Sequence, residues 1–197
     1  MSSKLRITGA WPAWSPEVRE GRMSSPDGHG RRVLLRILDH VPGDARTLAE
    51  LQDEAQSLAS LRVPGLLRLV HVTSLKGKAA LVYRFEEVVS VARVLDAQRV
   101  RGGYLPVRIC VEILHGVAQT VARAEQEAQS RLDKGFLAHR GPTPEDVLVD
   151  GKGGLHLAGL RIQTGPPGLP LVGYTPPEGS RSGAALAYGL GAFAVEL

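Results

Sequence analysis

The first 85 residues alternate short runs of strand-forming residues with turn sequences. Each run is rich in β-branched and large apolar side chains, which pack well on a pleated surface. The turn sequences between the runs include residues 24–30 and residues 74–77, both with glycine. The pattern predicts five strands, at residues 4–9, 18–23, 31–38, 66–72 and 78–85.

One helix interrupts this series of strands. Leucine and alanine recur at spacings of three and four residues between Asp44 and Leu61, as they do on one face of a helix. Pro42-Gly43 precede this segment and Pro64-Gly65 follow it, which is typical of helix boundaries.

The second half of the chain is mainly helical by the same criterion. Helices are predicted at residues 89–100, 106–130 and 183–197, and short strands at residues 147–149 and 155–157. The longest helix carries an apolar stripe made of Val107, Cys110, Ile113, Leu114, Val117, Val121 and Ala124. These elements predict an α+β fold with strands gathered in the first half.

Residues 138–162 resemble the catalytic loop and the metal-binding loop of the eukaryotic-type serine/threonine protein kinases. In that family the motif H-R-D-x-x-x-x-N leads into a pair of short strands and then D-F-G, and A-P-E follows. The positions of this chain that match the structural part of these motifs are His139, Arg140, Pro144, Glu145, Pro177 and Glu178.

Three further matches lie in the first half. Arg36 takes the place of the strand lysine that binds the nucleotide phosphates, and Glu54 that of the helix glutamate which pairs with the lysine. Tyr83 matches the residue at the back of the nucleotide pocket. The resemblance implies that Arg36, Glu54 and Tyr83 are vestigial cofactor-binding residues, and it implies a Glu54–Arg36 ion pair.

The resemblance also implies a two-lobed, protein-kinase-like fold. Residues 1–85 would form a small lobe of five antiparallel strands plus one helix, and residues 86–88 the hinge. Residues 89–197 would form a truncated, mainly helical large lobe that ends at its central helix.

The residues that carry kinase chemistry are replaced in this chain. Gly141 stands where the catalytic aspartate belongs, Asp146 replaces the metal-binding asparagine, and Gly159 replaces the aspartate of D-F-G. The phosphate-binding loop between the first two strands, residues 9–16, keeps a single glycine and has two prolines. We therefore expect a catalytically inactive member, a pseudokinase, with no cofactor and with at most weak metal binding by Asp146.

Simpler interpretations of several residues remain open at this stage. By the strand pattern alone, Arg36 would extend its guanidinium into solvent. Trp11 and Trp14 are expected to form a local apolar plug rather than a ligand platform. Cys110 and His115 have no partner nearby in sequence that would indicate a nucleophile or a metal site.

Composition limits the setting in which the chain works. The 197 residues are 43% hydrophobic and 22% charged, with a net charge of +4 and one cysteine. The basic residues are spread along the chain, which argues against nucleic-acid binding. Without a signal peptide, a long apolar run or a disulfide pair, the sequence indicates a cytoplasmic protein that does not enter a membrane.

The last predicted helix suggests how the protein works. From Leu186 to Val195 it is apolar on nearly every side, and such a helix needs burial all round. We expect a protein partner or self-association to cover the flank left by the missing C-terminal helices. The predicted role is a binding scaffold or an allosteric regulator in signalling. The alternative is a kinase homologue with residual binding of ATP and Mg²⁺ or weak phosphotransfer.

Overall fold

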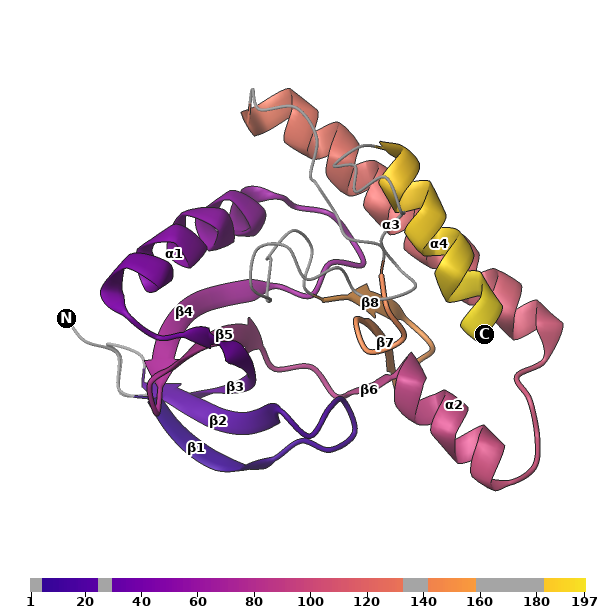
Figure 1. Cartoon of the computed structure of the whole chain (residues 1–197), viewed down its shortest axis with the longest axis horizontal. Helices are drawn as coiled ribbons and strands as arrows, with labels where there is room; N and C mark the ends of the chain where they lie inside the picture. Colours follow the sequence, from indigo (N-terminus) through magenta and orange to yellow (C-terminus); the bar gives the residue numbers. More distant parts are fainter. Residues whose placement is uncertain (1–4, 25–29, 133–141, 159–182) are drawn as a thin grey trace.

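The computed structural model describes residues 5–24, 30–132, 142–158 and 183–197, and these form two lobes (Figure 1). The small lobe is a five-stranded antiparallel sheet in the order β1-β2-β3-β5-β4, with one helix packed beside β4. Its elements are β1 (Leu5–Ala10), β2 (Val18–Ser24), β3 (Gly30–Pro42), α1 (Ala45–Ser60), β4 (Leu69–Leu75) and β5 (Lys78–Arg84).

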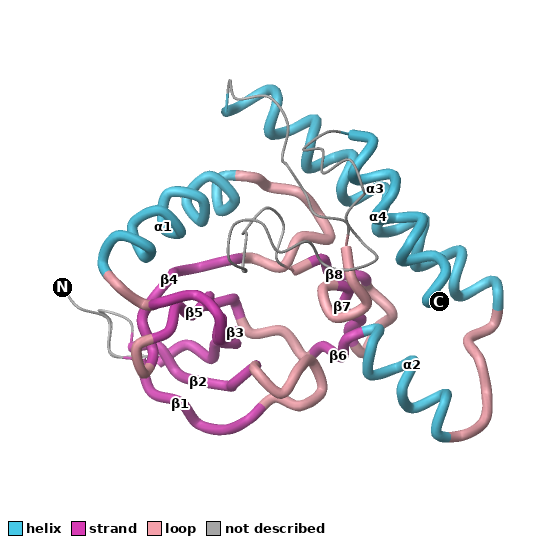
Figure 2. Tube along the Cα trace, viewed as in Figure 1, coloured by secondary structure: helices cyan, strands magenta, loops and turns pink. Residues whose placement is uncertain are grey.

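The large lobe combines helices with a small antiparallel sheet in the order β6-β7-β8 (Figure 2). Helices α3 and α4 lie side by side at one face of the lobe. The elements are β6 (Val88–Ser90), α2 (Val91–Val100), α3 (Val107–Leu132), β7 (Val147–Asp150), β8 (Leu155–Leu157) and α4 (Gly183–Glu196). The structure confirms the predicted α+β, two-lobed fold with a mainly helical large lobe.

Side-chain caps define where several elements begin and turn. Asp44 caps α1, because its Oδ1 accepts hydrogen bonds from the backbone N–H groups of Arg46 (3.0 Å) and Thr47 (2.9 Å). Asp150 closes the turn between β7 and β8 in the same way. Its hydrogen bonds to His156 and to backbone N–H groups of the turn lower the pKa of Asp150 to about 2.

One predicted strand is shifted. The segment expected as a strand at residues 66–72 pairs as β4 only from Leu69 onward and continues to Leu75. The reason is that Leu67 donates its N–H to the carbonyl of Leu157 in the large lobe (3.0 Å) instead of joining the sheet. The turn that follows is reduced to Lys76 and Gly77, both with positive φ (51° and 77°).

The two largest hydrophobic cores support one lobe each, and the core of the small lobe reaches into the space between the lobes. The core of the large lobe surrounds α3 and takes in Phe193 from α4. The core of the small lobe lies under α1 and extends to Leu148 and Ala158 of the large lobe. The space between the lobes, called the cleft below, is therefore filled by buried side chains from both of them.

Candidate functional site

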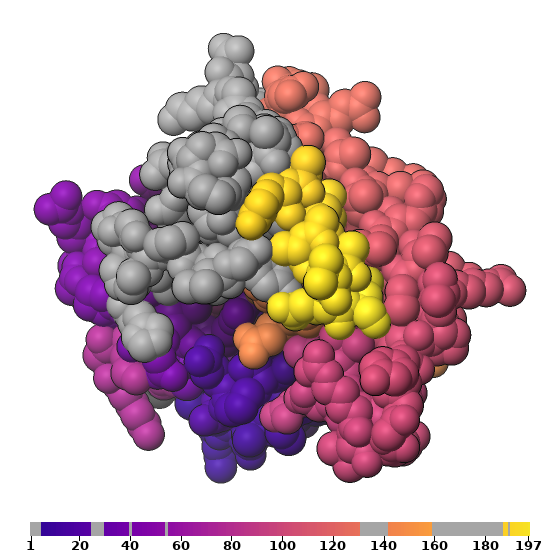
Figure 3. Space-filling model, turned by 45° about the vertical axis from the view of Figure 1, so that its right-hand side comes forward, coloured from indigo at the N-terminus to yellow at the C-terminus, as the bar shows by residue number. Residues whose placement is uncertain are grey.

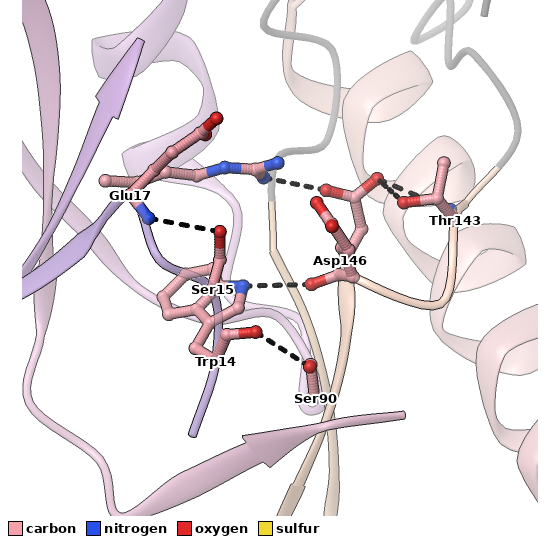
Figure 4. A network of polar contacts seen from close by, with 8 residues as sticks. Trp14, Ser15, Glu17, Ser90, Thr143 and Asp146 are labelled. Carbon is pink, nitrogen blue, oxygen red and sulfur yellow. Dashed lines mark hydrogen bonds and ion pairs between the residues drawn. The ribbon is translucent and has the colours of Figure 1, made fainter. Parts of the chain in front are cut away.

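A buried ion pair joins the two lobes inside the cleft. Arg36 on β3 places its Nη1 2.7 Å from Oδ1 of Asp146, the residue just before β7 (Figure 4). Only 7% of Arg36 and 1% of Asp146 are exposed. The prediction from the strand pattern, that Arg36 reaches solvent, is therefore wrong. Arg36 lies on the face of β3 that also carries the buried Leu34, because side chains alternate along a strand.

A tight turn holds the carboxylate of Asp146 in place. The Asp146 N–H donates to the carbonyl of Thr143 (2.9 Å), and Thr143 donates its N–H (3.3 Å) and its hydroxyl (2.9 Å) to Oδ2 of Asp146. Both carboxylate oxygens are thus engaged, Oδ1 by Arg36 and Oδ2 by Thr143. Aspartate is common in turns for its local hydrogen bonds, and Asp146 in addition connects its turn to Arg36 in the other lobe.

The ion pair fixes the charge of the guanidinium. Burial is the largest single influence on the pKa of Arg36, and alone it would lower that pKa. The charge and hydrogen bond of Asp146, with the charges of Tyr83 and Glu145, outweigh burial and raise the pKa of Arg36. Asp146 thus favours the charged form of the Arg36 guanidinium.

Within the described residues, the two charged groups expected to face magnesium and nucleotide contact each other. Mg²⁺ requires several oxygen ligands in nearly octahedral geometry, and both oxygens of Asp146 already have partners. Across the described ranges no group of three or more His, Cys, Asp or Glu side chains could hold a metal ion. The cation that would face phosphates, Arg36, is bonded to Asp146.

The segment between β1 and β2 lies in the cleft as well. We call residues 11–15 the strap. Trp14 in the strap is 1% exposed, belongs to the core of the small lobe, and stacks at a tilt on Tyr83 with ring centroids 5.4 Å apart. Its Nε1 donates to the backbone carbonyl of Glu145 in the large lobe (2.9 Å). The predicted apolar plug is confirmed for Trp14.

The strap is also bonded to the start of the large lobe. Trp11 packs edge-on against Phe85 at the end of β5, with ring centroids 5.3 Å apart. Three hydrogen bonds are donated to backbone carbonyls of the strap: Ser90 N to Ala13 O (2.9 Å), Ser90 Oγ to Trp14 O (2.8 Å) and Arg93 Nε to Pro12 O (2.9 Å). In the other direction, Trp11 Nε1 donates to Val88 O (3.1 Å).

The structure places only some of the predicted site residues. Arg36, Tyr83 and Asp146 meet at the cleft, and Pro144 and Glu145 are beside them with their carbonyls bonded to Ala92 N (3.0 Å) and Trp14 Nε1 (2.9 Å). Glu54 lies on α1 and its side chain is outside the description, so the Glu54–Arg36 pair stays a prediction. Outside the described residues lie His139, Arg140, Gly141, Gly159, Pro177 and Glu178.

Sequence reasoning identified both members of the ion pair but not their contact. Arg36 and Asp146 are 110 residues apart, and β3 is apolar on both faces, so alternation alone does not tell which face is buried. A signal was present nonetheless. Arginine at the position matched to the family's lysine and aspartate at the position matched to its asparagine carry opposite charges, so the two side chains are able to form an ion pair.

Comparison with solved structures identifies the fold. The kinase domain of PknI from Mycobacterium tuberculosis superposes with a TM-score of 0.67 at 23% sequence identity, over 99% of this chain and 71% of that chain. A double mutant of the same domain gives a TM-score of 0.70 at 19% identity, over 99% and 74%. No family model matches the sequence, and no curated protein matches it.

These structures agree with the architecture described above, and at such low identity the agreement concerns the fold alone. No helix in the described part of the chain is long and apolar enough to cross a membrane. The five-stranded small lobe, the helical large lobe and the cleft between them together establish that this chain has a protein-kinase-like fold.

Proposed function

We propose that this chain is a catalytically inactive protein-kinase-like protein, a pseudokinase, that acts as a binding scaffold or an allosteric regulator in signalling. The observation that carries the proposal is the buried contact between Arg36 and Asp146 (2.7 Å). Phosphoryl transfer requires a cation on the phosphates, metal-binding groups and a base that positions the acceptor hydroxyl. Here the cation and the carboxylate in the cleft neutralise each other.

The sequence supports the same conclusion at the two other catalytic positions. Gly141 stands at the position of the base, and glycine has no side chain that could accept a proton. Gly159 stands at the position of the second metal-binding carboxylate. With one carboxylate already bonded to an arginine, the described residues offer no pair of ligands that would orient Mg²⁺.

The alternative is a kinase homologue with residual ATP binding or weak phosphotransfer. It is favoured by the survival of both charges in the cleft, because Arg36 could face phosphates and Asp146 could face Mg²⁺ if their contact opened. Opening it would leave two buried charges without their partner, and each is costly to bury alone. For this reason we prefer the inactive assignment.

A nucleotide titration separates the two assignments. We expect the melting temperature of the full chain to stay unchanged in millimolar ATP, with or without Mg²⁺, because a ligand that does not bind the folded state cannot stabilise it. Radiolabelled γ-phosphate should transfer neither to the chain nor to a generic protein substrate. Magnesium-dependent stabilisation of the unaltered chain together with phosphate transfer would defeat the scaffold assignment.

The proposed interaction surface is the outer face of α4. Phe193 is fully buried against the core around α3, while Tyr188 and Val195 are 43% and 88% exposed. Figure 3 shows α4 at the surface of the molecule beside α3. An exposed apolar helix face is a common site of association, and we propose that a partner protein or a second copy of the chain covers it.

A further inference from the structure

We infer that the open edge of β1 binds an extended, acidic segment of a partner protein, whose carboxylates pair with Arg6 and Arg22. The inference rests on the proposed scaffold role and deepens it, because it names the chemistry of one partner. The surface belongs to the small lobe and is therefore separate from the outer face of α4 in the large lobe.

Three arginines lie in register across the first three strands of the sheet. Arg6 on β1 is opposite Arg22 on β2, and Arg22 is opposite Arg32 on β3. Directly opposite residues of an antiparallel sheet share a face, so the three side chains form one row. All three residues are exposed, whereas Leu34 on the same face of β3 is fully buried. The row therefore lies outside the cleft.

The described residues neutralise this row at one end only. Arg32 donates from Nε to Oε1 of Glu20 (2.9 Å), and this bond, with the charge of Glu87, raises the pKa of Arg32. Within the described ranges, the side chains of Arg6 and Arg22 make no hydrogen bond or ion pair. The uncompensated positive charge is thus at the end of the row that lies nearest the edge of the sheet.

The register of the arginines is unfavourable for the isolated chain. Like charges on opposite residues of neighbouring strands repel and destabilise the sheet. A local arrangement that lowers stability without a compensating contact is expected at functional sites, where a ligand supplies the missing interaction. For a guanidinium that ligand is an anion, and a carboxylate can accept two parallel hydrogen bonds from it.

The edge of β1 favours a peptide as the source of this anion. β1 is the first strand in the sheet order, so the described strands leave its outer edge unpaired, and it contains no proline (Figure 1). An extended peptide can add to such an edge through main-chain hydrogen bonds. The irregular register between Ile7 and Gly9 leaves the first half of the strand, which includes Arg6, for regular pairing.

The charge of the row argues against a second copy of the chain as the occupant. Pairing of β1 with another β1 would bring a second Arg6 to a surface that is already positive. An acidic segment supplies the opposite charge at the same distance. Because exposed ion pairs contribute little each and are screened by salt, the binding should be weak and should fall as the salt concentration rises.

The probe for this surface is a labelled peptide of alternating glutamate and threonine, whose carboxylates share one face when it is extended. Fluorescence anisotropy should show binding to the unaltered chain at low salt. The double variant Arg6→Gln with Arg22→Gln should weaken the binding at least about fivefold. The matched control, Arg99→Gln with Arg101→Gln, removes the same charge from exposed positions on α2 and should change it by less than about twofold.

Two further measurements test the strand edge and the repulsion. Bound peptide should slow hydrogen exchange of backbone N–H groups in β1 but not in β4, the strand at the opposite edge of the sheet. Without peptide, Arg22→Gln should raise the melting temperature at low salt, because it removes a like charge from the row. A lower melting temperature would assign Arg22 a structural role and contradict the inference.

The inference is overturned if the peptide does not bind, if the α2 control weakens binding as much as the double variant, or if β1 gains no protection. It is also overturned if oligothymidylate or phosphatidylserine vesicles bind the same arginines more tightly at equal ionic strength. Nucleotide binding and phosphate transfer with peptide binding intact would refute the scaffold assignment alone. Absence of peptide binding in a chain that ignores nucleotide would refute this inference alone.

Discussion

At the scale of single residues, the Arg36–Asp146 pair determines what the cleft can do. Taken alone, each residue differs from the catalytic residue at the matching kinase position. Together they form an ion pair, which a lysine and an asparagine cannot form because asparagine is uncharged. Burying two charges is favourable only when both are bonded, and the Asp146 carboxylate is bonded on both oxygens. The pair thus forms a structural connection between the two lobes.

Removal of one member of the pair should be strongly destabilising. Arg36→Met leaves the Asp146 carboxylate buried without its cation, and we expect it to lower the free energy of unfolding by about 3–5 kcal/mol. The double variant Arg36→Met with Asp146→Leu should lose less than the sum of the two single variants, because it removes both charges together. Urea unfolding of the unaltered chain, the two single variants and the double variant measures the coupling free energy between Arg36 and Asp146.

The matched control is a surface pair on α1. Arg46 and Glu50 lie 3.1 Å apart with side chains that are 90% and 67% exposed. Arg46→Met should therefore change the free energy of unfolding by no more than about 0.5 kcal/mol. Strict additivity of the Arg36 and Asp146 effects would show that their contact contributes nothing.

Helices and strands whose residue pattern is visible within their own sequence could be predicted. Those that depend on pairing with a distant part of the chain could not. The helix at residues 44–61 follows from leucine spacing and appears as α1, Ala45–Ser60, after its Asp44 cap. Strand β6 was not predicted, because its three residues extend only by pairing with β7. The late start of β4 has a similar cause, since Leu67 bonds to Leu157 across the cleft.

The candidate site shows the same division. The resemblance to kinases assigned Arg36, Tyr83 and Asp146 to one cleft, since a motif carries positional information over long sequence distances. The burial of Trp14 was foreseen, but its bond to Glu145 joins residues 131 positions apart, and no periodicity encodes such a contact. Packing of the two lobes, rather than local propensity, produces both the ion pair and this bond.

The connection between α1 and β4 offers a test of close packing. Gly65 has a φ of +89°, and a Cβ there would lie 2.5 Å from Oγ1 of Thr120 on α3. Gly77 has a φ of +77°, with nothing within 4 Å of an added Cβ. Alanine at either position incurs the strain of a left-handed backbone, about 1–2 kcal/mol.

Gly65→Ala should therefore be the more destabilising of the two substitutions. The clash with Thr120 adds about 1–3 kcal/mol to the backbone strain, because a tightly packed site must rearrange to accept a methyl group. The midpoints of urea unfolding for Gly65→Ala and Gly77→Ala measure the difference directly. Equal midpoints would mean that the segment around Gly65 moves away from α3 without cost.

For the whole molecule, the contacts described above fasten the two lobes at several separate places. Besides the chain itself, they are joined by the strap, by the Arg36–Asp146 pair and by the bond between Leu67 and Leu157. Domain closure in proteins of two lobes requires a hinge that is free to rotate. These contacts hold the two lobes together, and the scaffold role proposed above is supported by such an arrangement.

The proposed association surface can be tested with two valines of equal exposure. Val195 on α4 and Val100 on α2 are both 88% exposed. If the outer face of α4 is covered by a partner or a second copy, Val195→Glu should abolish co-purification or shift sedimentation to the monomer. Val100→Glu should leave both unchanged, because a charge at an exposed position outside an interface has little effect. A chain that is monomeric and captures no protein in either form contradicts the proposed surface.

The strap has one more consequence. The chain has two tryptophans, and both are in this five-residue segment. Near-ultraviolet emission of the unlabelled protein therefore comes almost entirely from the seam between the lobes. Any event that separates them moves the Trp14 indole from an apolar enclosure into water and shifts that emission to longer wavelength. The protein thus contains an intrinsic optical sensor for the opening of its own cleft, ready for use in stopped-flow experiments.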